Sequence, residues 1–162
     1  MPDTTLRPGE IATCNAVRAD ATIQFIGSIQ TPWPTRDQCP RQGSVDGPEC
    51  QIHLFKPWDD ALDGIDAYER IEVLYWLDHS RRDLLLQSPA SDGRVRGTFS
   101  LRSPVRPNPI GTSLVVLENR DGNCLTVRGL DCLNGTPLVD LKPDRCAYSP
   151  IAPPKHTTDS RQ

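Results

Sequence analysis

The residues best suited to chemistry lie in a ten-residue loop from Arg102 to Gly111, with the sequence Arg-Ser-Pro-Val-Arg-Pro-Asn-Pro-Ile-Gly. Its three prolines fix their own φ angles and push the preceding residues toward extended geometry, so the loop is stiff before any ligand arrives. Stiffness lowers the ordering cost of binding. Arg102, Arg106 and Asn108 would present polar groups on this frame, and a guanidinium matches carboxylate or phosphate bidentately. The loop therefore suits an anion site, although a rigid connector between two strands explains the same sequence.

Four arginines in and beside this loop form a local basic patch. Arg94, Arg96, Arg102 and Arg106 fall within thirteen residues that contain no acidic side chain. They are either an anion site or four solvated surface arginines. The whole chain carries a net charge of −3, which argues against a protein that grips nucleic acid by bulk charge alone.

A second candidate site is the segment Asn134-Gly135-Thr136-Pro137. Asn-Gly is a turn dipeptide, and Thr-Pro begins an extended run. The exposed amides of such a turn can hold a small polar ligand. A turn that only reverses the chain is the alternative interpretation.

Three further positions carry groups that bind ligands or transfer protons. Asp140 and Lys142 share one face if their strand is regular, and a surface ion pair is the default arrangement there. His79 directly follows an apolar strand, so its imidazole is a base, a ligand contact or only a satisfied group at the strand edge. Residues 40–42, Pro-Arg-Gln, lie in a Pro- and Gly-rich stretch from 31 to 50, and loops of that length are often functional.

The elements that position these residues are predicted to be short strands. Apolar and alternating runs predict strands over 22–30, 51–55, 69–77, 94–101, 113–118, 123–128 and 137–141, and residues 58–65 predict one or two helical turns. Many short strands with few helical segments predict a mainly β fold, a small β-barrel or sandwich with short helical segments. The glycine-rich fingerprint of dinucleotide-binding folds is absent, which disfavours a Rossmann-type site.

The chain of 162 residues suits one domain with a core. We expect this domain from residue 21 to residue 148, between a flexible leader over 1–20 and a flexible tail over 149–162. The N-terminus lacks the apolar region of a signal peptide, and no apolar stretch approaches the roughly 20 residues of a membrane helix. A cytoplasmic protein with six reduced cysteines and no membrane partner is therefore expected. No Cys-x-x-Cys pair occurs and the three histidines are scattered, so no metal site is expected.

These separate signals occur together, and in the same order, in one known family. The matching pieces are Ile26-Gly27-x-Ile29-x-Thr31-Pro32, Pro40-Arg41-Gln42, the strand ending at His79, Thr98 to Gly111, Asn134-Gly135-Thr136-Pro137 and Asp140-Leu141-Lys142-Pro143. Over roughly residues 22 to 143 the chain resembles the TrmO (YaeB/VirR-like) family of tRNA methyltransferases. The block Arg-Ser-Pro-x-Arg-Pro-Asn-Pro-Ile-Gly is the most specific part of this resemblance.

The resemblance implies a β-barrel methyltransferase that is distinct from the Rossmann and knotted types and works as a homodimer. It implies S-adenosylmethionine as the cofactor and tRNA as the partner, with methylation of N6 of threonylcarbamoyladenosine beside the anticodon. Carried over position by position, the cofactor would contact Pro40, Arg41, Gln42, His79, Ser80, Arg102, Thr112, Asn134, Gly135, Thr136 and Pro137.

The chain departs from the family pattern at several of these positions. Ser80, Thr112 and Asn134 stand where the family commonly has Gln, Leu and Asp, and Asp144 follows Lys-Pro where the family has Tyr. The extra C-terminal domain of longer members is also expected to be missing. These departures keep open an alternative, an S-adenosylmethionine-binding module of the same fold with a different methylation substrate or none. A plain RNA-binding β-barrel is a third reading, which the acidic net charge disfavours.

Methyl transfer from a sulfonium is an in-line displacement, so the protein mainly aligns the reacting atoms. A carbamoylated exocyclic nitrogen is a poor nucleophile, which predicts a base or a charge-stabilising group. The candidates for this group are Asp140, Asp144 and His79, and the sequence does not favour one of them over the others. The residues expected to face the substrate are Arg106, Asn108 and Lys142, of which Arg106 and Lys142 would hold a carboxylate or a phosphate.

Overall fold

The computed structural model describes residues 5–14 and 19–144. The strands in these ranges are β1 (Ile11–Ala12), β2 (Gly27–Gln30), β3 (Cys50–Leu54), β4 (Arg70–Trp76), β5 (Leu84–Gln87), β6 (Arg96–Gly97), β7 (Ile110–Asp121), β8 (Cys124–Arg128) and β9 (Thr136–Pro143). Three short 3-10 helices are η1 (Trp58–Leu62), η2 (Ile65–Ala67) and η3 (Thr98–Ser100). The tail expected over 149–162 lies outside the described residues.

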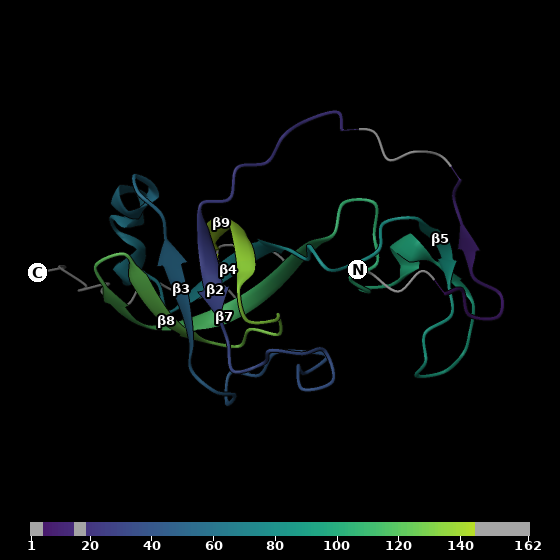
Figure 1. Cartoon of the computed structure of the whole chain (residues 1–162). Helices are drawn as coiled ribbons and strands as arrows, with labels where there is room; N and C mark the ends of the chain where they lie inside the picture. The colour runs from purple at the N-terminus through teal and green to yellow at the C-terminus, as the bar shows by residue number, and fades with distance from the viewer. Residues whose placement is uncertain (1–4, 15–18, 145–162) are drawn as a thin grey trace, which may run out of the picture. The chain divides into compact units, whose positions relative to one another are not determined.

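Six of the strands close into a barrel in the order β2-β3-β8-β7-β4-β9 (Figure 1). The ring is closed by the antiparallel pairing of β2 with β9, in which Ser28 lies opposite Pro137. The predicted mainly β barrel with short helical segments is therefore confirmed. Closure removes the exposed strand edges that an open sheet would present.

The barrel core follows from the alternation of side chains along each strand. In β4, Ile71, Val73 and Tyr75 are buried, while the residues between them are partly exposed. In β7 the same period buries Val115 and Leu117. Because successive side chains of a strand point to opposite faces, one face of each strand fills the barrel interior, and its burial is the main stabilising contribution.

Residues 119–122, Asn-Arg-Asp-Gly, carry a pattern typical of a β-hairpin turn, and a hairpin between β7 and β8 forms there. Asp121 pairs with Cys124 across the turn. The strand β7 is longer than expected, because its pairing with β8 extends through Asn119 and Arg120 to the turn itself. By contrast, the strand predicted over 22–30 is shorter, since regular pairing with β3 and β9 begins only at Gly27.

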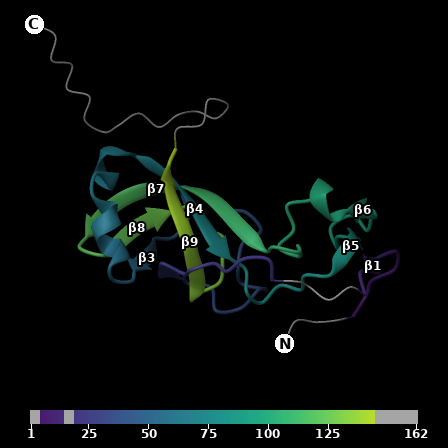
Figure 2. The same ribbon diagram turned by 90° about the horizontal axis from the view of Figure 1, so that it is seen from above.

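The described residues divide into two compact units, where sequence analysis expects one domain over 21–148. The barrel unit comprises Gln24–Tyr75 and the residues from Thr112 onward, and the second unit comprises residues up to Ile23 together with Trp76–Gly111. In the second unit β1, β5 and β6 form a three-stranded antiparallel sheet (Figure 2). Part of the expected flexible leader is thus structured, because Ile11 and Ala12 pair with β5.

The strand predicted over 94–101 is wrong for most of its length. Only Arg96–Gly97 is extended and paired, and the 3-10 helix η3 follows at once. The reason is a contact between separate segments: the Thr98 hydroxyl donates to the carbonyl oxygen of Leu84 at 2.6 Å, where the chain leaves the sheet as η3. Among the described residues, no helix has the length and apolar character needed to cross a membrane.

Candidate functional site

The Asn134-Gly135 turn precedes β9 and is tied to the end of β2. The main-chain amide of Asn134 donates to the carbonyl of Trp33, and that of Gly135 donates to the carbonyl of Ile29, both at 2.8 Å. Gly135 has a φ of +82°, a conformation that favours glycine. Both main-chain amides therefore already have protein acceptors, which favours the alternative of a turn that reverses the chain over main-chain binding of a ligand.

The Asn134 side chain is what this turn offers to a ligand. Its Oδ1 accepts a hydrogen bond from the Thr31 amide at 3.2 Å, and the residue is exposed. The Oδ1 bond orients the amide group and leaves its NH2 as a donor. In contrast, the neighbouring Thr136 is buried, and its hydroxyl donates to the Leu133 carbonyl at 2.7 Å.

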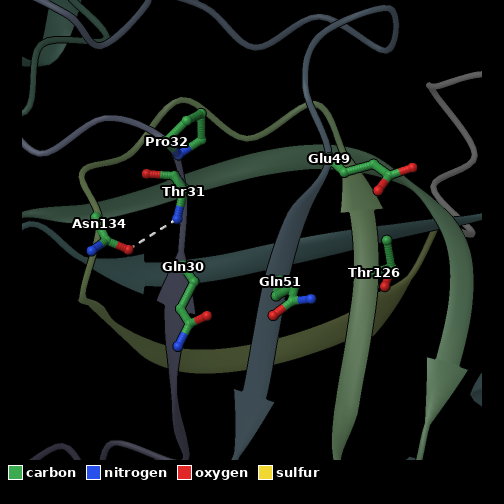
Figure 3. Close-up of a pocket in the computed structure, with 7 residues that line it drawn as sticks. All are labelled: Gln30, Thr31, Pro32, Glu49, Gln51, Thr126 and Asn134. Carbon is green, nitrogen blue, oxygen red and sulfur yellow. Dashed lines mark hydrogen bonds between the residues drawn. The ribbon is translucent and has the colours of Figure 1, made fainter.

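A shallow polar pocket lies beside this turn on the barrel unit (Figure 3). Its volume is about 540 Å³, and it is lined by Gln30, Thr31, Pro32, Glu49, Gln51, Thr126 and Asn134. Figure 3 shows that Gln30, Gln51 and Thr126 come from the neighbouring strands β2, β3 and β8. The lining is made mainly of amide and hydroxyl groups, so the pocket suits a neutral polar group better than an anion.

Asp131 is the functional candidate that sequence reasoning missed. Its Oδ1 accepts hydrogen bonds from the Tyr75 hydroxyl at 2.6 Å and from the Ser113 hydroxyl at 2.9 Å. Its Oδ2 accepts one from the Gly43 amide at 3.2 Å. Burial, followed by the neighbouring Asp131 charge, raises the pKa of Tyr75 far above its usual range, so this hydroxyl keeps its proton.

The residues 40–42 sit on the long loop between β2 and β3, next to this carboxylate. Cys39, on one side of them, donates from its thiol to the Asp131 carbonyl at 3.2 Å, and Gly43 lies on the other side. Arg41 and Gln42 are exposed. Within residues 5–14 and 19–144 their side chains have no hydrogen bond or ion pair, which leaves both available to a ligand.

The Pro-rich loop belongs to the second unit and is shaped by its own arginine. Arg106 donates from Nη1 to the carbonyls of Leu101 at 2.8 Å and Ser103 at 3.0 Å. Outside the loop, Arg82 donates to the Pro107 carbonyl at 2.6 Å and stacks over the Trp76 ring at 5.5 Å. The stiffness that the prolines predict is thus reinforced by hydrogen bonds.

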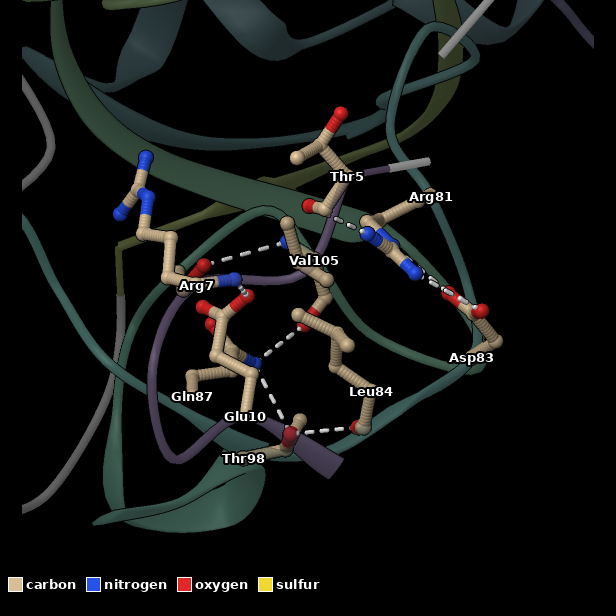
Figure 4. Close-up of polar contacts among 10 residues, drawn as sticks. Thr5, Arg7, Glu10, Arg81, Asp83, Leu84, Gln87, Thr98 and Val105 are labelled. Atoms are coloured by element: carbon tan, nitrogen blue, oxygen red, sulfur yellow. Dashed lines mark hydrogen bonds and ion pairs between the residues drawn. The ribbon is translucent and has the colours of Figure 1, made fainter. Parts of the chain in front are cut away.

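A buried glutamine joins this loop to the small sheet (Figure 4). Gln87, 5% exposed, donates from Nε2 to the Thr98 hydroxyl and to the Val105 carbonyl, both at 2.8 Å. On the other side of β5, Glu10 accepts from the main-chain amides of Arg7 and Ser88. The residues 7–10 are therefore held against the same sheet.

The remaining predicted residues of this unit are exposed or lie in turns. Arg102 and Asn108 are exposed, and the described part of the chain provides no partner for the Arg102 guanidinium. His79 follows β4 with its side chain 80% exposed, 3.7 Å from the Asp78 carboxylate. Ser80 closes the turn by donating its amide to the Leu77 carbonyl.

The structure thus assigns the predicted cofactor residues to two units. The barrel unit carries Pro40, Arg41, Gln42, Thr112, Asn134, Gly135, Thr136 and Pro137, and the second unit carries His79, Ser80 and Arg102. Within the barrel unit, the Thr112 hydroxyl donates to Glu72 at 2.9 Å.

Three of the candidates for substrate contact or for a base, Asp140, Lys142 and Asp144, lie on the barrel unit and have partners there. Lys142 and Asp140 form the expected surface ion pair at 2.6 Å, and this hydrogen bond raises the pKa of Lys142. Asp144 is buried, with its Oδ2 3.5 Å from the Arg70 Nε. Each carboxylate is thus paired with a cation, and the Lys142 ammonium keeps further N–H donors for an anion.

The described residues contain no group of three or more His, Cys, Asp or Glu side chains placed to hold a metal ion. The cysteines at positions 14, 39, 50, 124 and 132 are free thiols. Burial raises the pKa of Cys50 to about 11 and that of Cys132 well above its usual range. These two thiols are therefore protonated core groups and not ready nucleophiles.

The side chains left available match the groups of S-adenosylmethionine. The Arg102 guanidinium suits the methionyl carboxylate, because it carries paired donors and has no partner in the described chain. The Asn134 amide and the polar pocket beside it suit the edge of an adenine or a ribose hydroxyl. The donor set present therefore fits this cofactor.

Comparison with known proteins agrees with the fold and the motifs. The family model described as tRNA-methyltransferase O N-terminal domain matches residues 28–148. A probable S-adenosyl-L-methionine-binding protein VirR of Rhizobium radiobacter is 54% identical over 153 residues, which cover 94% of this chain and 87% of the relative. The tRNA (adenine(37)-N6)-methyltransferase of Escherichia coli K12 is 35% identical, over 82% of this chain and 60% of its own length.

Solved structures show the same fold. A crystal structure of TrmO from Pseudomonas aeruginosa matches with a TM-score of 0.61 at 28% identity, over 80% of this chain and 60% of that one. A second crystal structure of TrmO matches with a TM-score of 0.65 at 27% identity, over 88% of this chain and 62% of the other. The chain spans about three fifths of the length of these solved structures. It belongs to the tRNA-methyltransferase O family.

Proposed function

We propose that this protein is an S-adenosylmethionine-dependent methyltransferase that modifies N6 of the adenine beside the tRNA anticodon, in its threonylcarbamoyl form. The observation that carries the proposal is the family match over residues 28–148, which includes the whole Pro-rich loop and the Asn134 turn. It is supported by a relative that is named tRNA (adenine(37)-N6)-methyltransferase and is 35% identical.

The proposed cofactor contacts, taken for each unit by itself, combine rigid main chain with a few free polar side chains. On the barrel unit, Pro40, Arg41 and Gln42 are held by the bonds of Cys39 and Gly43, and Asn134 is oriented by Thr31. On the second unit, Arg102 supplies the guanidinium for a carboxylate. The other proposed contacts are His79, Ser80, Thr112, Gly135, Thr136 and Pro137, with Thr136 contributing main chain because its hydroxyl is bonded to Leu133.

When bound, S-adenosylmethionine supplies an electrophilic methyl group. The protein's part is to hold the acceptor nitrogen in line with that methyl, which is a contribution of positioning. Side chains that keep their partners, such as Arg106 in its own loop, form a pre-organised frame for this alignment. Arg106, Asn108 and Lys142 are proposed to face the RNA, where Nη2 of Arg106 and the Lys142 ammonium bind a carboxylate or phosphate.

The proton on the acceptor nitrogen needs a route away from the site. Asp140 is held by Lys142, and Asp144 is buried against Arg70. His79 has the most exposed side chain of the three candidates, and Asp78 is its carboxylate neighbour. The arrangement names no single catalytic base, and the three candidates differ in what must be displaced before each acts.

The proposed setting is a homodimer in the cytoplasm, with tRNA as the partner. We keep residues 21–148 as the proposed catalytic region, between the leader over 1–20 and the tail over 149–162.

A second candidate function is cofactor binding with a different methylation substrate or none. It is favoured by the names of the more similar relatives: proteins 54% and 43% identical to this chain are called probable S-adenosyl-L-methionine-binding proteins. Ser80, Thr112, Asn134 and Asp144 depart from the family pattern. Calorimetric titration with S-adenosylmethionine is expected to give saturable binding for both candidates, and incubation of the complex with tRNA then separates them by the appearance of a methylated nucleoside.

A further inference from the structure

Asp131 is bonded to both ends of the tripeptide Pro40–Gln42. Its main-chain carbonyl accepts the Cys39 thiol at 3.2 Å, and its side-chain Oδ2 accepts the Gly43 amide at 3.2 Å. Cys39 and Gly43 directly flank the tripeptide. Asp131 is therefore hydrogen-bonded to both residues that flank the segment.

The second carboxylate oxygen of Asp131, Oδ1, is hydrogen-bonded to the barrel wall. Tyr75 in β4 and Ser113 in β7 both donate to Oδ1, at 2.6 and 2.9 Å. The two hydroxyls are also 2.8 Å apart. Since both side chains are buried, their positions are fixed by packing, and two donors at one oxygen prevent the carboxylate from rotating.

The carboxylate thus divides its oxygens between two tasks. Oδ1 is held by the rigid barrel, and Oδ2 holds the loop. Farther along the same loop, the Gly47 carbonyl accepts from Arg128 at 2.7 Å, so the loop has a second anchor that does not involve Asp131. Removal of the Oδ2 bond alone should therefore free residues 40–43 without releasing the loop as a whole.

We propose that Asp131 is a positioning residue for the cofactor. It transmits the rigidity of the barrel wall to Pro40–Gln42, so that Arg41 and Gln42 meet the cofactor with little loss of conformational freedom. The inference rests on the proposed function, because it takes residues 40–42 as cofactor contacts. It adds a residue whose own atoms face the protein and not the ligand.

The substitution Asp131→Asn isolates the loop bond. In the variant, the oxygen of the new side-chain amide accepts the hydrogen bonds of Tyr75 and Ser113, so its NH2 group points toward the main-chain amide of Gly43. Because both of these groups are donors, the hydrogen bond to Gly43 is lost. We expect the Gly43 amide to exchange with solvent faster and the Kd for S-adenosylhomocysteine to rise by about tenfold or more. The matched control Tyr75→Phe removes a barrel-side donor and keeps the Gly43 bond, so it should lower the thermal midpoint while changing the Kd less.

Hydrogen exchange at Gly43 and calorimetry with S-adenosylhomocysteine decide the matter together. An unchanged Kd for Asp131→Asn would overturn the proposal. So would a raised Kd with unchanged exchange, because Asp131 would then act directly on the ligand. If Asp131→Asn does not fold, Cys39→Ala removes the other anchor without touching a buried charge, and the proposal requires a raised Kd there too. Failure of the unsubstituted protein to bind would instead contradict the proposed function.

Discussion

Gly43 and Gly129 pass so close together that neither a side chain nor a water fits between their main chains. A Cβ atom built on Gly43 would lie 1.8 Å from the Gly129 carbonyl oxygen. Gly129 follows β8 and is buried, with a φ of +115°. At Gly43, the long loop between β2 and β3 therefore packs directly against the main chain that follows β8.

Substitution Gly43→Ala should displace this part of the loop. Backbone must move because the obstructing atom is a main-chain oxygen, and the Gly43–Asp131 bond is lost with it. We expect the free energy of unfolding to fall by about 1–3 kcal/mol and the affinity for S-adenosylmethionine to fall as well. Gly97→Ala is the control, since its nearest atom would be 4.0 Å away at a φ of −61°. A Gly43→Ala protein as stable in urea as Gly97→Ala would contradict the close approach.

Arg102 and Arg106 should have separable effects. Arg106→Ala removes the bonds to Leu101 and Ser103, so the loop loosens and RNA binding or turnover weakens, while cofactor affinity stays nearly unchanged. Arg102→Ala removes an exposed guanidinium and should raise the Kd for S-adenosylmethionine by about tenfold or more. Calorimetry with the cofactor and filter binding with tRNA measure the two effects. Equal losses in both assays for Arg106→Ala would show that its assignment is wrong, and an unchanged Kd would remove Arg102 from the cofactor site.

Thr98 should be essential to the second unit. Thr98→Val leaves the Leu84 carbonyl without its hydroxyl donor and deprives Gln87 of an acceptor, in a buried setting. Loss of such partners costs about 1–3 kcal/mol. Thr98→Ser keeps the hydroxyl and is the control. Denaturant unfolding should rank the valine variant clearly below the serine variant, and equal midpoints would mean that the hydroxyl does not hold η3 in place.

The stability of the barrel should fall at alkaline pH. Burial raises the folded-state pKa of Cys50 to about 11 and also raises that of Cys132. The unfolded thiols lose their protons near pH 8.5, so above that pH the unfolded state binds fewer protons and is favoured. The slope is about 1.4 kcal/mol per pH unit for each such group until its folded pKa is reached. Urea unfolding from pH 8 to pH 10 or so should show this decline, and Cys132→Ala should make it shallower; an identical slope would contradict the assignment.

The sequence predicts those parts of the fold that depend on local pattern. The two-residue period of β4 places Ile71, Val73 and Tyr75 inside, and the Asn-Arg-Asp-Gly turn places the β7–β8 hairpin. The strand over 94–101 is not predicted correctly, because a hydrogen bond of Thr98 to a distant carbonyl overrides the alternation.

The candidate site is predicted only where a motif marks it. Arg102, Asn108 and the Asn134 turn stand out by composition. The sequence does not show that the main-chain amides of Asn134 and Gly135 donate to carbonyls in β2 and in the loop after it. Asp131 has no motif of its own. The role proposed for it depends on contacts with Gly43, 88 residues away, and with Tyr75, 56 residues away, and a single sequence does not record such contacts. The sequence offers one indication of Asp131: the alternation of β4 places the Tyr75 side chain inside the barrel, and a buried hydroxyl requires a hydrogen-bond partner.

The central claim is that this protein methylates tRNA at N6 of a threonylcarbamoylated adenosine. The most direct measurement is mass spectrometry of nucleosides from tRNA that carries this modification, after incubation with the purified protein and S-adenosylmethionine. We expect threonylcarbamoyladenosine to gain one methyl group in the presence of both, and in neither the cofactor-free nor the protein-free control. Saturable cofactor binding with no methylated nucleoside in tRNA would contradict the claim and leave the cofactor-binding alternative.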